Sequence, residues 1–535
     1  MLTKRLLTLA AISMLSFSCA QSESGIDNGT GGDTASGGGN GSGGATSSGG
    51  NKGSGGSSAT GGSTGNGGTG VTSTGGTTGQ GGSSAKGGAT GSGGTSSTGG
   101  ATGTGGTGAG GTGTGGHVTT GTGGATGSGG AATGGSPGTG GATGSGGATA
   151  TGGTTGQGGS SGAVENSGSS CNPTAAALLS ADNKKMPNPF AMHNGTVISS
   201  KSQWECRRNE VKADLEKYEI GPKQDPSTAT VKATLSGKNL TVAITTSSGS
   251  MNLTSAITGS GSCVYIVLDS ATGMVSGCTT VPFTSSQVVK SEQDSTQYQS
   301  DPFYKVYPSL WGKIGNYSAW AWGVSRLIDG LAQVASQLNI DMTKIAVHGC
   351  SYAGKMSLFS GALDERVALT IVEESGGGGI NSWRMSQEYT DRSGVQVEKI
   401  DNTNYGWFMP SMQKLDAYKL PHDHHELVAM IAPRAVIILG NDTYQWLGDE
   451  SGYKSTMAAL QVFTALGVPS NIGYDFTSNH NHCAPPTTQM NSVTAYANKF
   501  FKGGTTNPSV AIKPPDTSFD LNWQAAIDWT TPTLQ

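Results

Sequence analysis

Glycine crowds the first third of this sequence and limits how much of the chain can fold. The 535 residues include 91 glycines, and from about residue 25 to 162 the sequence consists almost entirely of Thr-Gly-Gly, Ser-Gly-Gly and Ala-Thr-Gly repeats. Such a segment has too little apolar surface to offset the entropy lost on ordering, which predicts a flexible tether. Paired glycines and the near absence of proline disfavour a collagen helix. We therefore expect a disordered linker at 20–170 and one folded domain at 171–535.

The first 19 residues are typical of an export signal. Lys4 and Arg5 precede an apolar stretch at 6–17, and small residues follow. Cys19 stands where a bacterial lipoprotein signal places its acylated cysteine, although the motif before it is imperfect. Lipidation of Cys19 is the favoured interpretation, and simple cleavage is the alternative. We therefore expect a secreted or cell-surface protein, an outer-membrane lipoprotein if acylated, whose membrane contact is confined to that lipid.

Charge and cysteine content narrow the classes of function. The formal net charge is −4 and no basic stripe occurs, so nucleic acid is not expected as a partner. The cysteines beyond Cys19 are Cys171, Cys206, Cys263, Cys278, Cys350 and Cys483. An even number in an exported chain predicts disulfides, although the residues alone leave the pairing open.

Strand and helix patterns alternate through the second half of the domain. Apolar runs typical of buried strands occur at 263–268, 345–348, 368–372, 435–439 and 471–476, and helical patterns at 318–338, 424–431, 455–466 and 489–501. Such alternation predicts a mostly parallel sheet covered by helices on both faces. Two alternating runs, 228–235 and 240–245, predict an antiparallel edge at its N-terminal side.

A sharp turn joins the strand at 345–348 to a helical pattern, and its sequence is Gly349-Cys350-Ser351-Tyr352-Ala353-Gly354-Lys355. Strand, glycine-flanked serine and helix form the layout of a nucleophile elbow, which lifts a serine hydroxyl above the sheet edge. The helix N-terminus then directs its N–H groups toward developing negative charge. The second glycine comes one residue later than in the common Gly-x-Ser-x-Gly motif. With its surroundings, this turn predicts an α/β-hydrolase three-layer sandwich with Ser351 as nucleophile.

A serine nucleophile needs an imidazole base and a carboxylate that orients it. His480 and His482 both follow the last strand, and spacing does not distinguish them. The carboxylate has two candidate places: Glu374, at the end of the strand after the elbow helix, and the loop after the next strand, which holds Asp442 and Asp449. The second place is the more usual one in this fold. The residues alone leave both choices open.

Three further histidines, His422, His424 and His425, suggest a metal site at first sight. Their spacing matches no known zinc site, and Asp423 between them is a good helix cap. A capping and packing role is therefore the favoured interpretation. We expect neither a metal nor a cofactor.

Several sequence blocks occur in the order found in one family. They are Pro187–Phe190, Trp204–Glu210, Ala319–Gly330, Gly349–Lys355, Glu374–Gly376, Asp423–His425 and His480–Cys483. Together they span most of the region from about residue 171 to 501. In these blocks the chain resembles the glucuronoyl esterases, the fifteenth family of carbohydrate esterases, whose elbow is Gly-Cys-Ser-x-x-Gly-Lys.

The resemblance implies an activity and a catalytic set. It implies a serine carboxylesterase that hydrolyses esters between the 4-O-methyl-glucuronic acid of glucuronoxylan and lignin alcohols. We expect a monomer. The resemblance implies Ser351 as nucleophile, His482 as base and Glu374 as the acid, with Asp449 as an alternative acid. The substrate would be a lignin–carbohydrate ester or a model methyl ester.

The resemblance also implies a disulfide framework. Cys171–Cys206 and Cys350–Cys483 match family bridges, and the second would hold the base against the nucleophile. A third family bridge would need cysteines near Ser382 and Ser455, which this chain lacks. Cys263 and Cys278 are left to pair with each other.

Substrate contacts follow from the same resemblance. Lys355, Gln396 and Trp446 match family residues that surround the sugar. Two positions depart from the pattern. Tyr352 stands where the family usually has an arginine beside the oxyanion, so only its backbone N–H and phenol can donate there. Asn404 falls where the family has a sugar-binding glutamate, which puts the fine specificity in question.

Two other functions remain compatible with the residues. One is another carbohydrate esterase, for instance of the acetyl-xylan type. The other is a non-catalytic, carbohydrate-binding surface lipoprotein, with Tyr352 and Asn404 as traces of lost activity. Glucuronate esters, acetylated xylan and an active-site serine probe distinguish the three.

Overall fold

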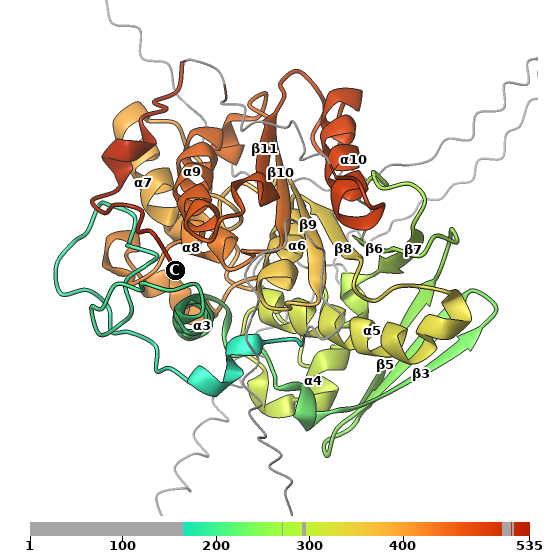
Figure 1. Cartoon of the computed structure of the whole chain (residues 1–535). Helices are drawn as coiled ribbons and strands as arrows, with labels where there is room; N and C mark the ends of the chain where they lie inside the picture. The colour runs from blue at the N-terminus through green and yellow to red at the C-terminus, as the bar shows by residue number, and fades with distance from the viewer. Residues whose placement is uncertain (1–163, 270, 292–295, 506–514, 516–517) are drawn as a thin grey trace, which may run out of the picture. The chain divides into compact units, whose positions relative to one another are not determined.

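The computed structural model describes residues 164–269, 271–291, 296–505, 515 and 518–535 (Figure 1). The expected signal peptide at 1–19, its Cys19 and nearly all of the expected linker at 20–170 lie outside these residues. Within the described ranges, no helix is both long enough and apolar enough to cross a bilayer.

A six-stranded parallel sheet forms the centre of the domain, in the order β11-β10-β9-β8-β6-β7. The strands are β6 (Val264–Leu268), β7 (Thr279–Phe283), β8 (Ile345–Cys350), β9 (Val367–Glu373), β10 (Ala435–Gly440) and β11 (Ile472–Phe476). Every residue of β6, β8, β9, β10 and β11 is buried, as expected for parallel strands covered on both faces. The prediction of a mostly parallel sheet is confirmed.

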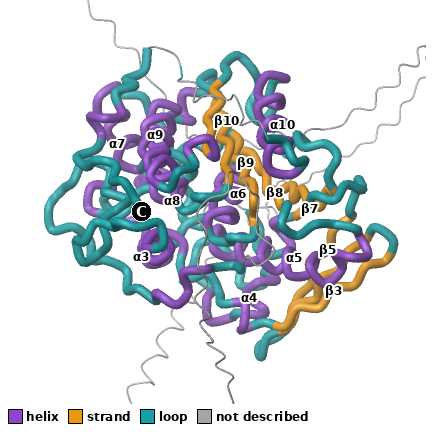
Figure 2. Tube along the Cα trace, in the orientation of Figure 1, coloured by secondary structure: helices purple, strands orange, loops and turns teal. Residues whose placement is uncertain are grey.

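Helices lie on both sides of this sheet (Figure 2). They are α3 (Gln203–Leu215), α4 (Pro302–Val306), α5 (Asn316–Leu338), α6 (Tyr352–Ala362), α7 (Trp383–Ser393), α8 (His424–Ala429), α9 (Asp449–Ala465) and α10 (Thr487–Phe501). Side chains alternate along β10: Ile437 packs in the cluster that contains α10, whereas Ile438 packs in the cluster that contains α5, α6, α8 and α9. The sheet is therefore the middle layer of three.

The prediction of an antiparallel edge on this sheet is wrong. The two predicted strands form a separate three-stranded antiparallel sheet, β3 (Thr230–Ser236), β4 (Asn239–Thr245) and β5 (Ser250–Ala256). Burial alternates along β4 and β5, so this sheet buries only one face. At its edge strand β3, the Val231 carbonyl accepts a hydrogen bond from Gln333 Nε2 of α5. The edge strands of the central sheet are β11 and β7, and β7 contains Pro282, a residue tolerated at sheet edges.

Helix ends follow local chemistry. The expected Asp423 cap is confirmed, since its carboxylate and the N3 Glu426 form a capping box at the start of α8. Helix α9 begins at Asp449, six residues before the apolar pattern predicts, after the left-handed Gly448. Asp449 and Glu450 therefore lie in the first turn of a helix and not in a loop. The helix dipole favours acidic side chains in a first turn. Helix α7 was not predicted.

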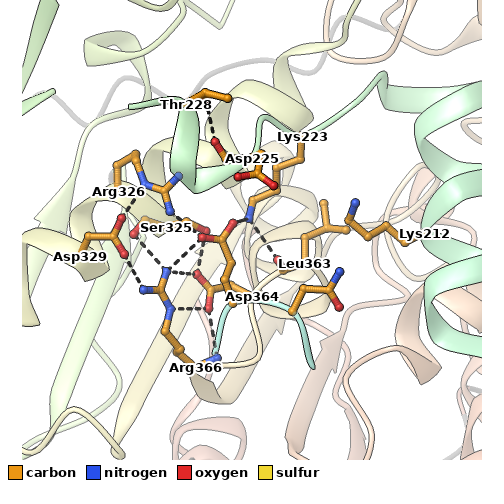
Figure 3. A network of polar contacts seen from close by, with 12 residues as sticks. Lys212, Lys223, Asp225, Thr228, Ser325, Arg326, Asp329, Leu363, Asp364 and Arg366 are labelled. Carbon is orange, nitrogen blue, oxygen red and sulfur yellow. Dashed lines mark hydrogen bonds and ion pairs between the residues drawn. The ribbon is translucent and has the colours of Figure 1, made fainter. Parts of the chain in front are cut away.

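Residues before 171 already belong to the described, packed part of the chain, which begins at residue 164. The Glu165 carboxylate forms ion pairs with Lys223, with Arg326 at 2.5 Å and with Arg366 at 3.5 Å. Figure 3 shows these cations together with Asp364, which binds Arg366 at 2.7 Å. Because residues 364–366 lie between α6 and β9, this cluster sits at the amino ends of the strands. The N-terminal segment thus joins the domain at the amino ends of the strands, whereas Ser351 lies at the carboxyl ends.

Removing the Glu165 charge should destabilise the domain. In Glu165→Ala the buried Lys223 and Arg326 lose a common anion, and breaking a buried ion pair costs about 3 kcal/mol. We expect a loss of that size in the free energy of unfolding in urea. The control is Glu388→Gln, which breaks an exposed pair with Arg392 and should cost less than about 1 kcal/mol. Equal free energies of unfolding for the two variants would contradict a stabilising role for the Glu165 ion pairs.

Candidate active site

Ser351 lies between β8 and α6, at the carboxyl end of the sheet, and is partly exposed. Its φ of 59° and ψ of −125° are rare for a residue with a side chain. The flanking glycines make this turn fit: a Cβ on Gly349 would lie 2.1 Å from the Ala353 carbonyl oxygen, and one on Gly354 would lie 2.4 Å from that of Glu373. The late second glycine therefore lets the helix pack directly against β9.

His482 lies in the loop between β11 and α10, and its ring is held by Glu374, the first residue after β9. His482 Nδ1 lies 2.7 Å from Glu374 Oε2. The Glu374 side chain is buried, and it also accepts hydrogen bonds from Asn441 Nδ2 at 3.2 Å and from the Cys483 N–H at 3.2 Å. Three donors thus fix a carboxylate that orients the imidazole, leaving Nε2 free to act as base.

A disulfide joins the residues next to Ser351 and His482. Cys350 and Cys483 are bonded, with their Cα atoms 5.7 Å apart, although they are 133 residues apart in sequence. Ser351 follows one cysteine and His482 precedes the other. His482 Nε2 is buried and makes no hydrogen bond to any described residue, Ser351 included. In substrate-free enzymes this bond is often long and tightens when the substrate binds.

The second candidate acid, Asp449, has a different partner. Tyr474 donates its hydroxyl to Asp449 Oδ1 at 3.2 Å, and burial raises the pKa of Asp449 to about 8. This side chain is therefore a neutral acid over much of the physiological range. A carboxylate that stabilises an imidazolium must be charged, so the geometry favours Glu374 over Asp449.

The second candidate base, His480, lies farther from the acid. Its Nδ1 is 3.8 Å from Glu374 Oε1, and its Nε2 is 2.9 Å from the Thr477 carbonyl oxygen. Both ring nitrogens of His480 face loop groups, including the Asn481 carbonyl oxygen at 3.1 Å from Nδ1. The residues alone did not decide which histidine meets the carboxylate. In the structure, His482 makes the short contact to Glu374.

The Tyr352 hydroxyl bonds Asp269. The phenol donates to Asp269 Oδ2 at 2.9 Å, and its ring stacks on Trp407 with centroids 5.6 Å apart. Burial, and then the Asp269 charge, raises the pKa of the Tyr352 hydroxyl. In this structure the phenol therefore has Asp269 as its acceptor, and its role as an oxyanion donor stays a prediction. The Tyr352 N–H remains, because the first N–H groups of a helix have no acceptor within it.

Two of the expected sugar contacts lie beside His482 and Ser351. The Trp446 ring meets the His482 ring nearly edge-on, with centroids 4.9 Å apart. Lys355 lies one helical turn after Ser351, and its N–H donates to the Ser351 carbonyl at 3.0 Å. Its ammonium is 2.8 Å from Glu398 Oε2.

The other two expected sugar contacts serve local turns. Gln396 is exposed, and its Nε2 donates to the Gly394 carbonyl at 3.4 Å. Asn404 Oδ1 accepts from the N–H groups of Gly406 at 2.8 Å and Trp407 at 3.3 Å. Asn404 therefore shapes the loop that carries Trp407.

The histidines that suggested a metal bind other groups. His422 Nε2 and His424 Nε2 each lie 2.7 Å from a different oxygen of Glu219, and His425 bonds a backbone carbonyl. In the described part of the chain, the clusters of potential metal ligands all include Cys350. Its sulfur is already in a disulfide, so it offers no thiolate.

Sequence reasoning missed three residues of this region: Asn441, Asp269 and Glu398. Asp269 directly follows one predicted strand and Asn441 lies two residues after another, so their place at the carboxyl ends of the strands could have been found. Glu398 lies in an irregular loop, and no local pattern marks it.

A strained serine at a strand–helix turn, with an imidazole and a buried carboxylate beside it on a parallel sheet, defines a serine hydrolase of the α/β-hydrolase class. A family model described as "Glucuronyl esterase, fungi" matches residues 230–467. A 4-O-methyl-glucuronoyl methylesterase from Hypocrea jecorina is 34% identical over 377 residues, covering 68% of this chain and 80% of that relative. The chain belongs to the glucuronoyl esterase family.

Solved structures agree with this assignment. The glucuronoyl esterase catalytic domain from Hypocrea jecorina has a TM-score of 0.61 and 33% identity, over 68% of this chain and 100% of that one. A mutant glucuronoyl esterase from Sporotrichum thermophile in complex with methyl 4-O-methyl-β-D-glucopyranuronate has a TM-score of 0.61 and 31% identity, over 68% of this chain and 99% of that one.

Opening the Cys350–Cys483 bridge should reduce both stability and turnover. In the double variant Cys350→Ser/Cys483→Ser, a long loop loses its closure, which costs about 2–5 kcal/mol in the free energy of unfolding. Turnover should fall because Ser351 and His482 are no longer held at one distance. The measurements are urea unfolding and kcat below the unfolding range.

The control for that experiment is Cys263→Ser/Cys278→Ser. This bridge spans only 15 residues and lies at the amino ends of β6 and β7, away from Ser351. Its loss should lower stability by a smaller amount and leave kcat nearly unchanged. Equal kcat losses in the two double variants would show that the first bridge has no special role.

Asp449→Asn should change how stability depends on pH. The folded protein keeps a proton on Asp449 up to pH about 8, whereas the unfolded chain releases it near pH 4. Asp449 therefore lowers the free energy of unfolding as pH rises between these values. The difference in the free energy of unfolding, variant minus wild type, should be larger at pH 8 than at pH 5. The variant should keep its esterase activity. Parallel pH profiles in urea unfolding would contradict this assignment, and the exposed Asp528→Asn is the control.

Proposed function

We propose that this protein is a serine carboxylesterase that hydrolyses esters of 4-O-methyl-glucuronic acid, such as those joining glucuronoxylan to lignin alcohols. The observation that carries the proposal is the 2.7 Å contact between His482 Nδ1 and the buried Glu374, held next to Ser351 by the Cys350–Cys483 bridge. Family membership supports the substrate class, since one solved relative is a complex with a methyl glucuronate ester.

The proposed reaction has two halves. Ser351 Oγ attacks the ester carbonyl while His482 Nε2 takes its proton, and the Tyr352 N–H donates to the oxyanion that forms. The imidazolium, stabilised by Glu374, then protonates the departing alcohol and an acyl-enzyme remains. Water, activated by His482, releases the glucuronic acid and restores the serine. These steps need no metal or cofactor.

The sugar is proposed to lie over the carboxyl ends of β8 and β9. Trp446 offers an aromatic surface next to His482, against which the apolar face of a sugar ring can pack. The residues around Lys355, one turn along α6, would meet the ring hydroxyls. Gln396 and Asn404 make local loop contacts, which gives them a supporting role in this proposal.

The site of action is proposed to be outside the cytoplasm. The described residues contain three disulfides, Cys171–Cys206, Cys263–Cys278 and Cys350–Cys483. The first and the third match the family bridges, and the second is the pairing expected for the two remaining cysteines. Disulfides of this kind persist in oxidising compartments. Export through residues 1–19, a lipid at Cys19 and a monomeric state belong to the same proposal.

Substitution of the three catalytic candidates tests the reaction. Ser351→Ala and His482→Gln should lower kcat on methyl or benzyl glucuronate by about 10⁴-fold or more, because the nucleophile or its base is lost. Glu374→Gln should also lower kcat strongly, since an amide cannot stabilise the imidazolium. Thermal unfolding of each variant shows whether the fold is kept.

Acetylated xylan is the comparison substrate. Preferential hydrolysis of acetylated xylan by the wild type would assign the site to another class of carbohydrate esterase. Binding of xylan without hydrolysis of either ester would make the domain a binding protein. Equal rates for wild type and Ser351→Ala on glucuronate esters would end the proposal.

A further inference from the structure

A second buried carboxylate, Glu219, binds two histidines in the interior of the domain. It lies in a single π-helical turn, Glu216–Ile220, directly after α3, and its side chain is fully buried. Oε1 accepts from His422 Nε2 at 2.7 Å and from Trp383 Nε1 at 3.1 Å, and Oε2 accepts from His424 Nε2 at 2.7 Å. Burial opposes the charge of Glu219, but the positive charge of His424 and the bonds from both histidines lower its pKa overall. The carboxylate is therefore an anion.

His424 needs a proton on each of its ring nitrogens. Its Nε2 faces Glu219, and its Nδ1 lies 2.6 Å from the Gly379 carbonyl oxygen. A carbonyl and a carboxylate only accept, and only the imidazolium form of histidine donates at both nitrogens. His422 differs, because its Nδ1 is buried without a partner among the described residues, so one proton on Nε2 satisfies it. The two histidines thus carry one positive charge, on His424.

The charged groups around His424 agree with this assignment. Burial lowers its pKa, but the Glu219 charge and hydrogen bond, and then the Asp423 charge, raise it overall. Asp423 is itself paired with Arg384 at 3.2 Å. His425, the next residue, has a pKa lowered by burial and adds no charge. His424 therefore keeps its proton to a higher pH than an ordinary histidine, and loses it as pH rises through the raised pKa.

The carbonyl that His424 binds belongs to the turn after Glu374. In this turn the Ile380 N–H donates to the Ser375 hydroxyl at 3.2 Å. A Cβ on Gly379 would lie only 2.3 Å from Ser375 Oγ. Gly379 therefore packs directly on the residue that follows Glu374, and a bond that fixes Gly379 also fixes this turn.

Glu374 has a backbone conformation that needs such support. Its φ is 43°, in the left-handed region that residues other than glycine rarely adopt. A residue keeps this conformation only where its surroundings determine it. Before the turn, the Glu374 N–H donates to the Leu439 carbonyl of β10 at 2.9 Å. After it, the bond from His424 holds the turn at 375–379.

We propose that the charged His424 is a positioning residue, which fixes the turn that keeps Glu374 against His482. This inference rests on the proposed function. When His424 loses its proton, one ring nitrogen no longer donates, so the bond to Gly379 or the bond to Glu219 is lost. Glu374 then orients the base less well. Because the imidazolium of His482 forms only in the transition state, kcat should fall and KM should stay nearly constant.

Nitrogen NMR of the histidine rings in the wild type tests the charge without any substitution. The chain has 8 histidines, and His424 is assigned from its contacts with the rings of Trp383 and Phe359, whose centroids lie 5.0 and 6.1 Å away. Both nitrogens of His424 should be protonated at pH 7. A neutral His424 ring at pH 7 overturns the inference.

The pH dependence of kcat on methyl glucuronate tests the positioning role. In the wild type, kcat should fall at the alkaline pH at which His424 titrates by NMR, with KM nearly constant. In Glu219→Gln the imidazolium loses its counter-charge, so both midpoints should move together to lower pH. At pH 8 the kcat of this variant should be about ten- to hundredfold below wild type, as expected for a displaced catalytic group. Circular dichroism shows that the fold is kept.

The matched control is His193→Gln. His193 also faces two acceptors, the Thr174 carbonyl at 3.0 Å and the Asp214 carboxylate at 2.9 Å, on α3 and the segment before it. Burial lowers the pKa of His193, but the Asp214 contact raises it overall. The alkaline fall of kcat in this variant should match wild type.

Two kinetic results overturn the inference. One is a wild-type kcat that does not fall at the pH at which His424 titrates, and the other is an unchanged profile in folded Glu219→Gln. A wild type that is inactive on methyl glucuronate overturns the proposed function and the positioning role together, whatever the charge of His424. A neutral His424 ring in an active wild type overturns the positioning role alone.

Discussion

One covalent bond brings the proposed catalytic residues together. Ser351 is held by an elbow on β8, whereas His482 sits in a loop more than a hundred residues later, and loops at a sheet edge are mobile by default. The Cys350–Cys483 bridge joins the residues next to each of them. Glu374 then accepts from both the His482 ring and the Cys483 N–H, so the same carboxylate orients the base and anchors its loop.

Several acids lie near this end of the sheet, and among the described residues Glu374 has the short contact to His482, the proposed base. Strand alternation sends Glu373 to the buried His348, at 3.0 Å, and leaves the next residue, Glu374, for His482. Asp449 is buried beside Tyr474 and its pKa is raised to about 8. Glu374 differs because three donors surround its carboxylate. The choice of catalytic acid thus follows from hydrogen-bond donors, which the strand order places there.

The sequence predicted the features that depend on local pattern. Continuous apolar runs predicted the buried parallel strands, and a serine between glycines after such a run predicted the elbow. Features that depend on distant contacts could not be predicted this way. The antiparallel strands pair with one another and not with the central sheet, which their local pattern does not decide. The Tyr352 phenol turned to Asp269, a partner far along the chain. The choice of Glu374 over Asp449 needed the family resemblance, and Glu398 had no sequence signal at all.

The central claim is that the fold activates Ser351 through His482. Labelling with a fluorophosphonate, followed by peptide mapping by mass spectrometry, tests it without any assumption about the natural substrate. The account predicts that the label lies on Ser351 in the wild type and that labelling of the folded His482→Gln variant is slowed by orders of magnitude. A label on another serine, or equal labelling rates in the two proteins, would contradict it.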